Sequence, residues 1–292
     1  MAVHLYNHLN SPGWVAVHRK ISMKANGATT YSQNITKYYW PIFEQVFQNY
    51  KKDVAVITVT RESHPLRFPE KLIFCFRHEC RFRQQPTIEN CRAFAQVNKH
   101  AKVIFIVWEE DCAIELHKNG LNAIFLPMAI DVEEIRSHLT PSTQFKNRVI
   151  YFGNVRNAKQ QAFFHLKACI QRHGWYLDRI SDNRFNGGVK LSRDDVLKIL
   201  QRYKYGVGVG ICAHEMAALG LKTYIYAYGR LGHLPMTQKE GQRLLYRNLC
   251  SPESATVNPV KALQNFPSSV VIQPRDIHDN QSLLLQSLRQ YL

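Results

Sequence analysis

Short apolar runs alternate along the first half of the chain with longer polar or amphipathic stretches. The apolar runs are nearly continuous, which is typical of strands covered on both faces of a sheet. They are Val54 to Thr60, Lys71 to Phe76, Lys102 to Trp108 and Ala123 to Ile130. The helix-like segments are Tyr31 to Tyr50, Thr87 to His100 and Glu109 to Asn119. Because strands and helices alternate, the pattern predicts right-handed crossovers and a parallel sheet.

The same alternation restarts after a polar stretch, Ser137 to Arg148, which contains Pro141 and is interpreted as a linker. The strands predicted here are Val149 to Gly153, Trp175 to Ser181, Tyr205 to Gly210, Thr223 to Gly229 and Ser269 to Pro274. The predicted helices are Ala158 to His173, a segment from a capping box at Ser192 to Tyr203, Ala213 to Leu219, and Asn280 to Leu292. The sequence thus predicts an α/β protein of two Rossmann-like domains, residues 1–140 and 145–275, with a ligand cleft between them. The terminal segment, residues 276–292, is expected to cross back to the first domain.

Length and composition agree with this organisation. The chain has 292 residues, enough for two α/β domains of roughly 150 residues each. It has no apolar run near the ~20 residues that cross a bilayer, and no apolar stretch of signal length at its start. Its seven cysteines include no C-x-x-C pair, which suits free thiols in a reducing compartment. We therefore expect a cytoplasmic protein without integral membrane association.

The charge is strongly basic, with a net value of +16 and a pI of about 9.6. Residues 103–146 carry three Lys and Arg against seven Asp and Glu, so an acidic segment separates two basic ones. This balance favours anionic partners, namely nucleic acid, an acidic membrane surface or a phosphorylated substrate. The alternative is that scattered basic residues only keep the surface solvated.

A candidate phosphate site follows the strand that begins the second domain. Gly153 and Asn154 lie at the end of that strand, and Arg156 and Lys159 lie where the next helix opens. Glycine allows a close approach of the backbone to a ligand, and a helix N-terminus attracts anions. The two basic side chains would add charge-assisted hydrogen bonds to a diphosphate. The alternative is an ordinary strand–turn–helix junction.

A second candidate is Glu215, near the start of a helix whose following residues are small or apolar. Those residues are expected to pack on the sheet and leave the carboxylate at the cleft, where it would accept both hydroxyls of a ribose. The alternative is a glutamate that caps the helix. The glycines at 206, 208 and 210 do not complete a G-x-G-x-x-G fingerprint, so close approach of a helix or ligand explains them better.

Basic and ionisable residues in the first domain are candidates for the acceptor site. The acceptor-binding candidates are His18, Arg19, Lys20, Lys24, Arg77, Arg81 and Arg83. The catalytic candidates, which follow two of the predicted strands, are Glu62, His64 and His78. Solvated basic loops are the alternative for both sets. No metal site is expected, because the Cys and His spacing matches no zinc finger and no Asp-x-Asp is present.

Taken together, these segments resemble the GT-B class of glycosyltransferases. Residues 99–135, with LPMAID near their end, resemble the end of that class's N-terminal domain. VIYFGNVRNAK resembles the opening of the C-terminal domain, and HEMAALGLKTYIY resembles its ribose-binding segment. The resemblance covers residues 99–230, and it implies that Arg156 and Lys159 hold the donor diphosphate and Glu215 the donor ribose. One departure is Thr223, eight residues after Glu215, where some retaining families have a second glutamate.

The expected function is transfer of a sugar from a nucleoside diphosphate sugar, expected to be a UDP-sugar, to a hydroxyl group. No tightly bound cofactor or metal is expected. The favoured acceptor is double-stranded DNA with hydroxymethylated bases, as in the bacteriophage enzymes that this chain resembles, acting in the cytoplasm of a bacterial host cell. One alternative is a transferase for lipopolysaccharide or another surface glycan. The other is a non-catalytic nucleic-acid-binding protein on a degenerate form of the fold.

Overall fold

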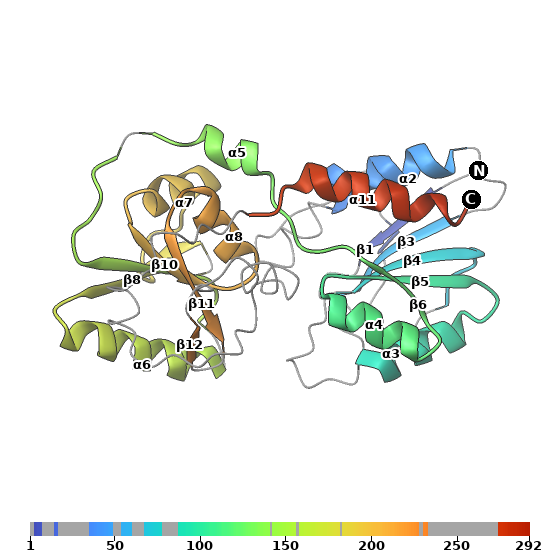
Figure 1. Cartoon of the computed structure of the whole chain (residues 1–292), viewed down its shortest axis with the longest axis horizontal. Coiled ribbons are helices and arrows are strands. Elements are labelled where there is room, and N and C mark those ends of the chain that lie inside the picture. The colour runs from blue at the N-terminus through green and yellow to red at the C-terminus, as the bar shows by residue number, and fades with distance from the viewer. Residues whose placement is uncertain are drawn as a thin grey trace. The chain divides into compact units, whose positions relative to one another are not determined.

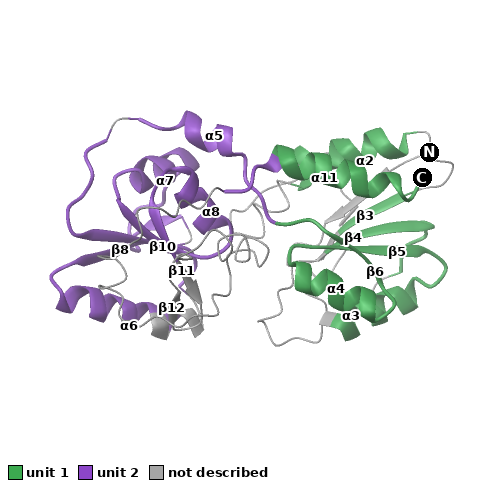
Figure 2. Ribbon diagram, viewed as in Figure 1, with its two compact units in different colours: residues 1–127, 278–292 green, residues 128–277 purple. Residues whose placement is uncertain are grey.

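The computed structural model describes two compact units, each built around its own six-stranded sheet. The described residues are 3–7, 15–16, 35–48, 54–59, 67–77, 87–140, 142–155, 158–181, 183–227, 230–232 and 274–292. The first unit comprises residues 1–127 and 278–292, and the second comprises residues 128–277 (Figure 2). The predicted α/β class is therefore confirmed.

The first unit has a largely parallel sheet in the order β2-β1-β3-β4-β5-β6 (Figure 1). Its strands are β1 (Val3–Asn7), β2 (Val15–Ala16), β3 (Val54–Val59), β4 (Leu72–Arg77), β5 (Lys102–Val107) and β6 (Asn122–Phe125). Only β2 pairs antiparallel, with β1. The prediction for β6 extended it to Ile130, but the strand ends before Pro127, which has no backbone N–H to offer to a ladder.

Helices cover both faces of this sheet. They are η1 (Ile35–Tyr39), a π-helical turn, followed by α2 (Trp40–Phe47), α3 (Thr87–Val97), α4 (Glu110–Lys118) and α11 (Ile277–Arg289). Helices α2 and α11 lie over one face, and α3 and α4 over the other (Figure 1). Pro41 lies in the first turn of α2, where the π-helical turn gives way to the α-helix and where a missing N–H leaves no hydrogen bond of α2 unmade.

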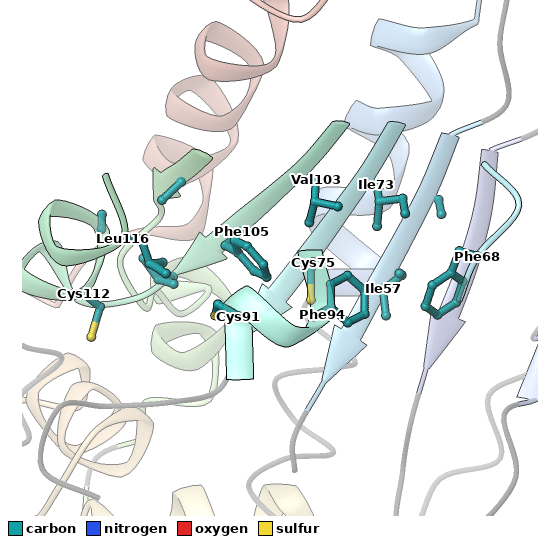
Figure 3. Close-up of a cluster of buried hydrophobic side chains, with 14 residues drawn as sticks. Ile57, Phe68, Ile73, Cys75, Cys91, Phe94, Val103, Phe105, Cys112 and Leu116 are labelled. Atoms are coloured by element: carbon teal, nitrogen blue, oxygen red, sulfur yellow. The ribbon is translucent and has the colours of Figure 1, made fainter. Parts of the chain in front are cut away.

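The alternation of side chains along the strands builds two apolar layers in this unit. On one face, Cys75 and Phe105 lie against Phe94 of α3 and Leu116 of α4 in a buried cluster (Figure 3). On the other face, the ring of Phe74 lies 5.1 Å from Phe43 and 5.7 Å from Tyr291 of the C-terminal segment. The continuous apolar runs in the sequence arise from this burial on both faces.

Helix α11 is anchored to the first unit by polar contacts as well as by this packing. Asn280 is buried, and its Nδ2 donates to the Tyr39 hydroxyl at 3.1 Å and to the Pro127 carbonyl. Gln281 Nε2 donates to the Tyr38 carbonyl at 2.8 Å. The C-terminal residues 278–292 thus belong to the same compact unit as residues 1–127.

The second unit has a mixed sheet in the order β12-β11-β10-β7-β8-β9. Its strands are β7 (Arg148–Phe152), β8 (Tyr176–Ser181), β9 (Arg184–Phe185), β10 (Tyr205–Gly208), β11 (Lys222–Ala227) and β12 (Arg230–Gly232). The four central strands are parallel, and the two short edge strands are antiparallel to their neighbours. Residues 269–273 of the last predicted strand lie outside the described residues.

The helices of the second unit also form two layers. They are α5 (Val132–Ser137), α6 (Ala158–Arg172), α7 (Arg193–Leu200) and α8 (Ile211–Ala218). Ile150 and Phe152 of β7 pack with α5, α7 and α8, while Val149 and Tyr151 pack with α6 on the other face. The unit begins at Met128, before the predicted linker, because α5 packs against α8 rather than joining the polar stretch that follows it.

An ion pair between a partly exposed arginine and a buried aspartate joins β7 to β8. Arg148 Nε and Nη2 donate to the two carboxylate oxygens of Asp178 at 2.8 and 2.9 Å. The Tyr203 hydroxyl donates to the same carboxylate at 2.8 Å, and Asn186 Nδ2 donates at 2.9 Å. Burial alone would raise the pKa of Asp178, but these hydrogen bonds outweigh it and lower the pKa below its usual value.

Candidate functional site

The candidate site is the carboxyl edge of the second sheet. Because β7, β8 and β10 are parallel, their last residues, Phe152, Ser181 and Gly208, lie at one edge. Helices α6 and α8 begin just after β7 and β10, and α7 begins after the short β9 that follows β8, so their N-terminal turns face this edge. Ligands of open α/β sheets bind outside the carboxyl ends of the strands, and helix N-termini there favour anions.

The turn after β7 has a fixed backbone and an exposed polar tip. Gly153 has a φ of 147°, a conformation that L side chains rarely adopt, and its N–H donates to Ile180 O at 3.0 Å. The Tyr151 hydroxyl donates to Asn154 O at 3.2 Å. The side chain of Asn154 remains exposed. The turn therefore requires glycine at position 153 for its backbone conformation, whereas the sequence predicted glycine there for close approach to a ligand, and Asn154 is exposed to solvent.

Of the two basic residues predicted to bind a phosphate at this turn, the structure describes one. Lys159 lies in the first turn of α6, where its backbone is described. Arg156 lies outside the described residues.

The glycines of β10 serve the packing of α8. A Cβ at Gly206 would overlap the sulfur of Met216, and a Cβ at Gly208 would lie 2.8 Å from both Met216 Cε and the backbone oxygen of Phe152. Gly210 is the N-cap of α8, with a φ of 57°. The predicted close approach of a helix is thus the reason for the glycine spacing, and it fixes α8 tightly on the sheet.

Glu215 of α8 forms the most prominent charged contact at this edge. Its carboxylate is 3% exposed, and it accepts hydrogen bonds from Arg193 Nη1 to Oε2 at 2.9 Å and from Nη2 to Oε1 at 2.6 Å. It caps no backbone N–H among the described residues, so the capping alternative does not account for it. Burial lowers the pKa of the Arg193 guanidinium, but the charge and hydrogen bonds of Glu215 outweigh this and raise it.

Arg193 is a residue that the sequence analysis did not single out. It occupies the first position of α7, after the N-cap Ser192, whose predicted capping box with Asp195 is confirmed. A cation in the first turn of a helix opposes the helix dipole, which favours acids there. The unfavourable position of this positive charge is the feature of the sequence that indicates a partner for Arg193 outside its own helix.

His214, beside Glu215, is fully buried without a hydrogen bond from either ring nitrogen to any residue that the structure describes. Burial, and to a lesser extent the positive charge of Arg275, lowers the pKa of His214 from 6.5 to about 4. The imidazole is therefore neutral at pH 7 and adds no charge to the site.

At the carboxyl edge of the first sheet, the structure describes one of the predicted acceptor and catalytic residues. Arg77 is the last residue of β4. Residues lying outside the described ranges are His18, Arg19, Lys20, Lys24, Glu62, His64, His78, Arg81 and Arg83.

A residue at this edge that the sequence analysis took only as the start of a helix is Glu109. It follows β5, is 2% exposed, and accepts a hydrogen bond from Cys112 Sγ at 3.8 Å. Its side chain makes no capping bond to α4, although it occupies the N-cap position. The feature of the sequence that could have identified Glu109 is an acidic residue directly after a predicted buried strand.

Comparison with known proteins does not assign the chain to a family. No protein-family model matches it, and no curated protein matches it significantly. In the described part of the chain, no helix has the length and apolar character needed to cross a membrane. Within the same residues, no cluster of three or more His, Cys, Asp or Glu side chains is arranged to hold a metal ion. The functional argument therefore rests on the geometry of the two sheet edges.

Proposed function

We propose that the chain is a glycosyltransferase that takes its sugar from a nucleoside diphosphate sugar bound at the carboxyl edge of the second sheet. The observation that carries this proposal is the buried Glu215 carboxylate of α8, which Arg193 at the start of α7 holds by two hydrogen bonds. An ionised group is costly to bury unless it serves a partner or a ligand. A carboxylate at this edge suits the hydroxyl groups of a ribose.

The diphosphate of the donor would lie on the turn after β7. Gly153 keeps that turn free of a side chain, and the N-terminus of α6 offers N–H groups and a positive dipole end. Lys159 in the first turn of α6 and Arg156 before it are proposed to neutralise the two phosphates. Negative charge grows on the diphosphate as the bond to the sugar breaks, so these groups would stabilise the transition state.

The reaction is a substitution at the anomeric carbon of the sugar. The acceptor hydroxyl oxygen forms a bond to that carbon, the bond from the carbon to the diphosphate oxygen breaks, and the diphosphate leaves with the electron pair. The hydroxyl proton passes to a base, for which Glu62, His64 and His78 are the candidates from the sequence. Proton transfer of this kind requires the base within hydrogen-bond reach of the acceptor.

The proposed acceptor is a hydroxymethylated base in double-stranded DNA. The net charge of +16 supports a polyanionic partner. The basic residues assigned to it are His18, Arg19, Lys20, Lys24, Arg77, Arg81 and Arg83. A base inside a duplex is reached only when it flips out of the stack. The proposed site of action is the cytoplasm of a bacterial host cell.

A transfer assay tests this function. Purified protein would be incubated with a panel of nucleotide-sugars and duplex DNA containing either 5-hydroxymethylcytosine or cytosine, and nucleosides would be analysed by mass spectrometry. The proposal predicts a sugar-sized mass gain on the modified base alone. This gain should be lost in Glu215→Gln and kept in Glu133→Gln, which changes an exposed acid of the same unit.

The other outcomes separate the alternatives. Release of nucleoside diphosphate without a gain on DNA would keep a transferase and move the acceptor to a surface glycan. Tight, salt-dependent DNA binding without any donor turnover would contradict the proposal and favour a non-catalytic DNA-binding protein.

A further inference from the structure

The amino edge of the second sheet, where the parallel strands β7, β8 and β10 begin, lies opposite the carboxyl edge proposed to hold the donor. The segments at this edge are residues 142–148, 174–178 and 201–205. Their Lys and Arg side chains are Lys146, Arg148, Arg202 and Lys204. The one acid in these segments, all of which the structure describes, is Asp178, and it is paired with Arg148. The amino edge therefore carries an excess of positive charge and favours an anionic partner.

Backbone hydrogen bonds join the three segments into one surface. The backbone N–H of Phe145 donates to the carbonyl of Arg202 at 2.7 Å, and that of Tyr176 donates to the carbonyl of Asn147 at 2.9 Å. Arg148 and Tyr176 are register partners on the neighbouring strands β7 and β8, so their side chains leave the sheet on the same face. The side chains of this surface are thus held at fixed positions relative to one another.

Guanidinium groups and aromatic rings alternate along this surface. The guanidinium carbon of Arg202 lies 4.1 Å from the centre of the Phe145 ring. That of Arg148 lies 5.3 Å from the Phe145 ring and 5.5 Å from the Tyr176 ring, within the range of a cation–π interaction. Two hydrogen bonds to Asp178, at 2.8 and 2.9 Å, fix the Arg148 guanidinium between them. We call this row the cation–π ladder, which consists of Arg202, Phe145, Arg148 and Tyr176.

The ladder ends in groups that reach solvent. Tyr176 is 61% exposed, although it is a large aromatic residue, and Arg148 holds its ring in a defined orientation. Arg202 is exposed at the other end of the ladder, and the neighbouring Lys204 is exposed as well. An exposed ring beside basic side chains suits a single nucleic-acid strand, because an unpaired base stacks on the ring while the cations bind phosphates. The bases of a duplex are already stacked on one another, so their faces are not available to the ring.

We propose that the cation–π ladder binds single-stranded nucleic acid, with a base stacked on Tyr176 and with phosphates bound by Arg202 and Lys204. This surface lies at the opposite ends of the strands from the candidate donor site, so it is a second site and does not depend on the proposed function. Its interaction with the strand is tolerant of sequence, because every base has a face that can stack.

Fluorescence anisotropy of the full-length chain tests this proposal. The probes are a labelled oligothymidylate of roughly 12 nucleotides, within the range that single-strand-binding folds cover, and a duplex of the same length. Tyr176→Ser should weaken binding of the single strand roughly 10-fold, because one stacked base is lost, and should change duplex binding by less than about twofold. Tyr176→Phe keeps the ring, so it should bind the single strand as wild type does.

The charges are tested by the salt dependence of binding to the single strand. Arg202→Gln combined with Lys204→Gln should reduce the slope of log K against log salt by about 1.4, because each phosphate contact on a single strand contributes about 0.7. The matched control is Lys99→Gln with Lys118→Gln, which removes two charges from exposed positions of the first unit and should leave the slope unchanged. Phe164→Ser removes an exposed ring from α6 and is the control for Tyr176→Ser. If Tyr176→Ser does not fold, as judged by circular dichroism, Tyr176→Phe and the salt slopes carry the test.

Four results would overturn the proposal. They are a wild-type protein that does not bind the single strand, a Tyr176→Ser variant that binds it as wild type does, equal losses of single-strand and duplex binding in that variant, and a salt slope that the Arg202 and Lys204 substitutions leave unchanged. Binding of phosphatidylglycerol vesicles that weakens in the same variants, without binding of the single strand, would assign the surface to an anionic membrane instead. None of these results bears on the donor site at the other edge of the sheet.

Discussion

Replacing His214 by methionine should remove much of the protein's loss of stability in mildly acidic solution. His214 is 0% exposed, and no residue in the described ranges hydrogen-bonds to its ring nitrogens. Burial, together with the nearby Arg275 charge, lowers the pKa of its imidazole from 6.5 to about 4 in the folded chain. Methionine has a similar volume and a flexible apolar side chain, so it suits the same buried space.

The direction of the pH effect on stability follows because the imidazole of His214 binds a proton more strongly in the unfolded chain than in the folded one. In the unfolded chain the imidazole binds a proton as the pH falls below about 6.5, whereas in the folded chain it stays neutral down to about pH 4. The unfolded state is therefore favoured as the pH falls through this window. Between pH 7.5 and pH 5.0 these two pKa values correspond to a loss of about 2 kcal/mol in the free energy of unfolding.

Urea unfolding of the full-length chain at both pH values measures this loss. Comparing wild type with His214→Met cancels the contributions of the other titrating groups, and the variant should lose about 2 kcal/mol less than wild type. His173→Met, which changes an exposed histidine of the same unit, serves as the control and should behave as wild type. Equal losses in wild type and His214→Met would refute the reasoning that burial keeps this imidazole neutral.

Three further substitutions, two at glycines and one in an ion pair, test the stability of the second unit by urea unfolding. Gly208→Ala should destabilise the protein by about 1–3 kcal/mol, because its Cβ would lie 2.8 Å from the backbone oxygen of Phe152, which cannot move aside. Gly206→Ala should cost less, because the nearest atom there belongs to a flexible methionine side chain. Asp178→Asn should cost about 2 kcal/mol at pH 7 by removing charge-assisted hydrogen bonds to Arg148, whose side chain is 37% exposed and stays partly solvated. Because the pKa of Asp178 is lowered on folding, this cost should be constant above about pH 5 and shrink as the pH falls below about 4. A cost that is independent of pH would show that the carboxylate charge does not contribute.

The elements of both sheets were largely predictable because they depend on local patterns. The nearly continuous apolar runs mark strands buried on both faces. The predicted helices Glu109 to Asn119 and Ala158 to His173 are each followed by a glycine with positive φ, Gly120 at 73° and Gly174 at 76°. The capping box that opens α7 was also read correctly from Ser192 and Asp195. In each case the signal lies within a few residues of the feature that it specifies.

Features that depend on distant segments escaped the prediction. Strand β1 has the sequence VHLYN, which is not a continuous apolar run, and β2 has only two residues. Strand β1 is fixed by its parallel pairing with β3, about fifty residues later. The pairing of Arg193 with Glu215 spans 22 residues and exists only once α7 and α8 pack on the sheet. At Gly206 the sequence predicted a close approach without deciding between a helix and a ligand, and the position of Met216 shows that it is a helix. Composition and spacing carry no information on such contacts.

The most direct test of the donor site does not require the acceptor to be known. Wild-type protein and Glu215→Gln would be incubated with UDP-sugars and with other nucleoside diphosphate sugars, and the release of free nucleoside diphosphate would be followed over time. Our account predicts slow release by the wild type, with water or DNA as acceptor, and release at the buffer level by Glu215→Gln. Release at the buffer level by the wild type, together with no binding of any nucleotide in calorimetry, would contradict the assignment of this sheet edge as a donor site.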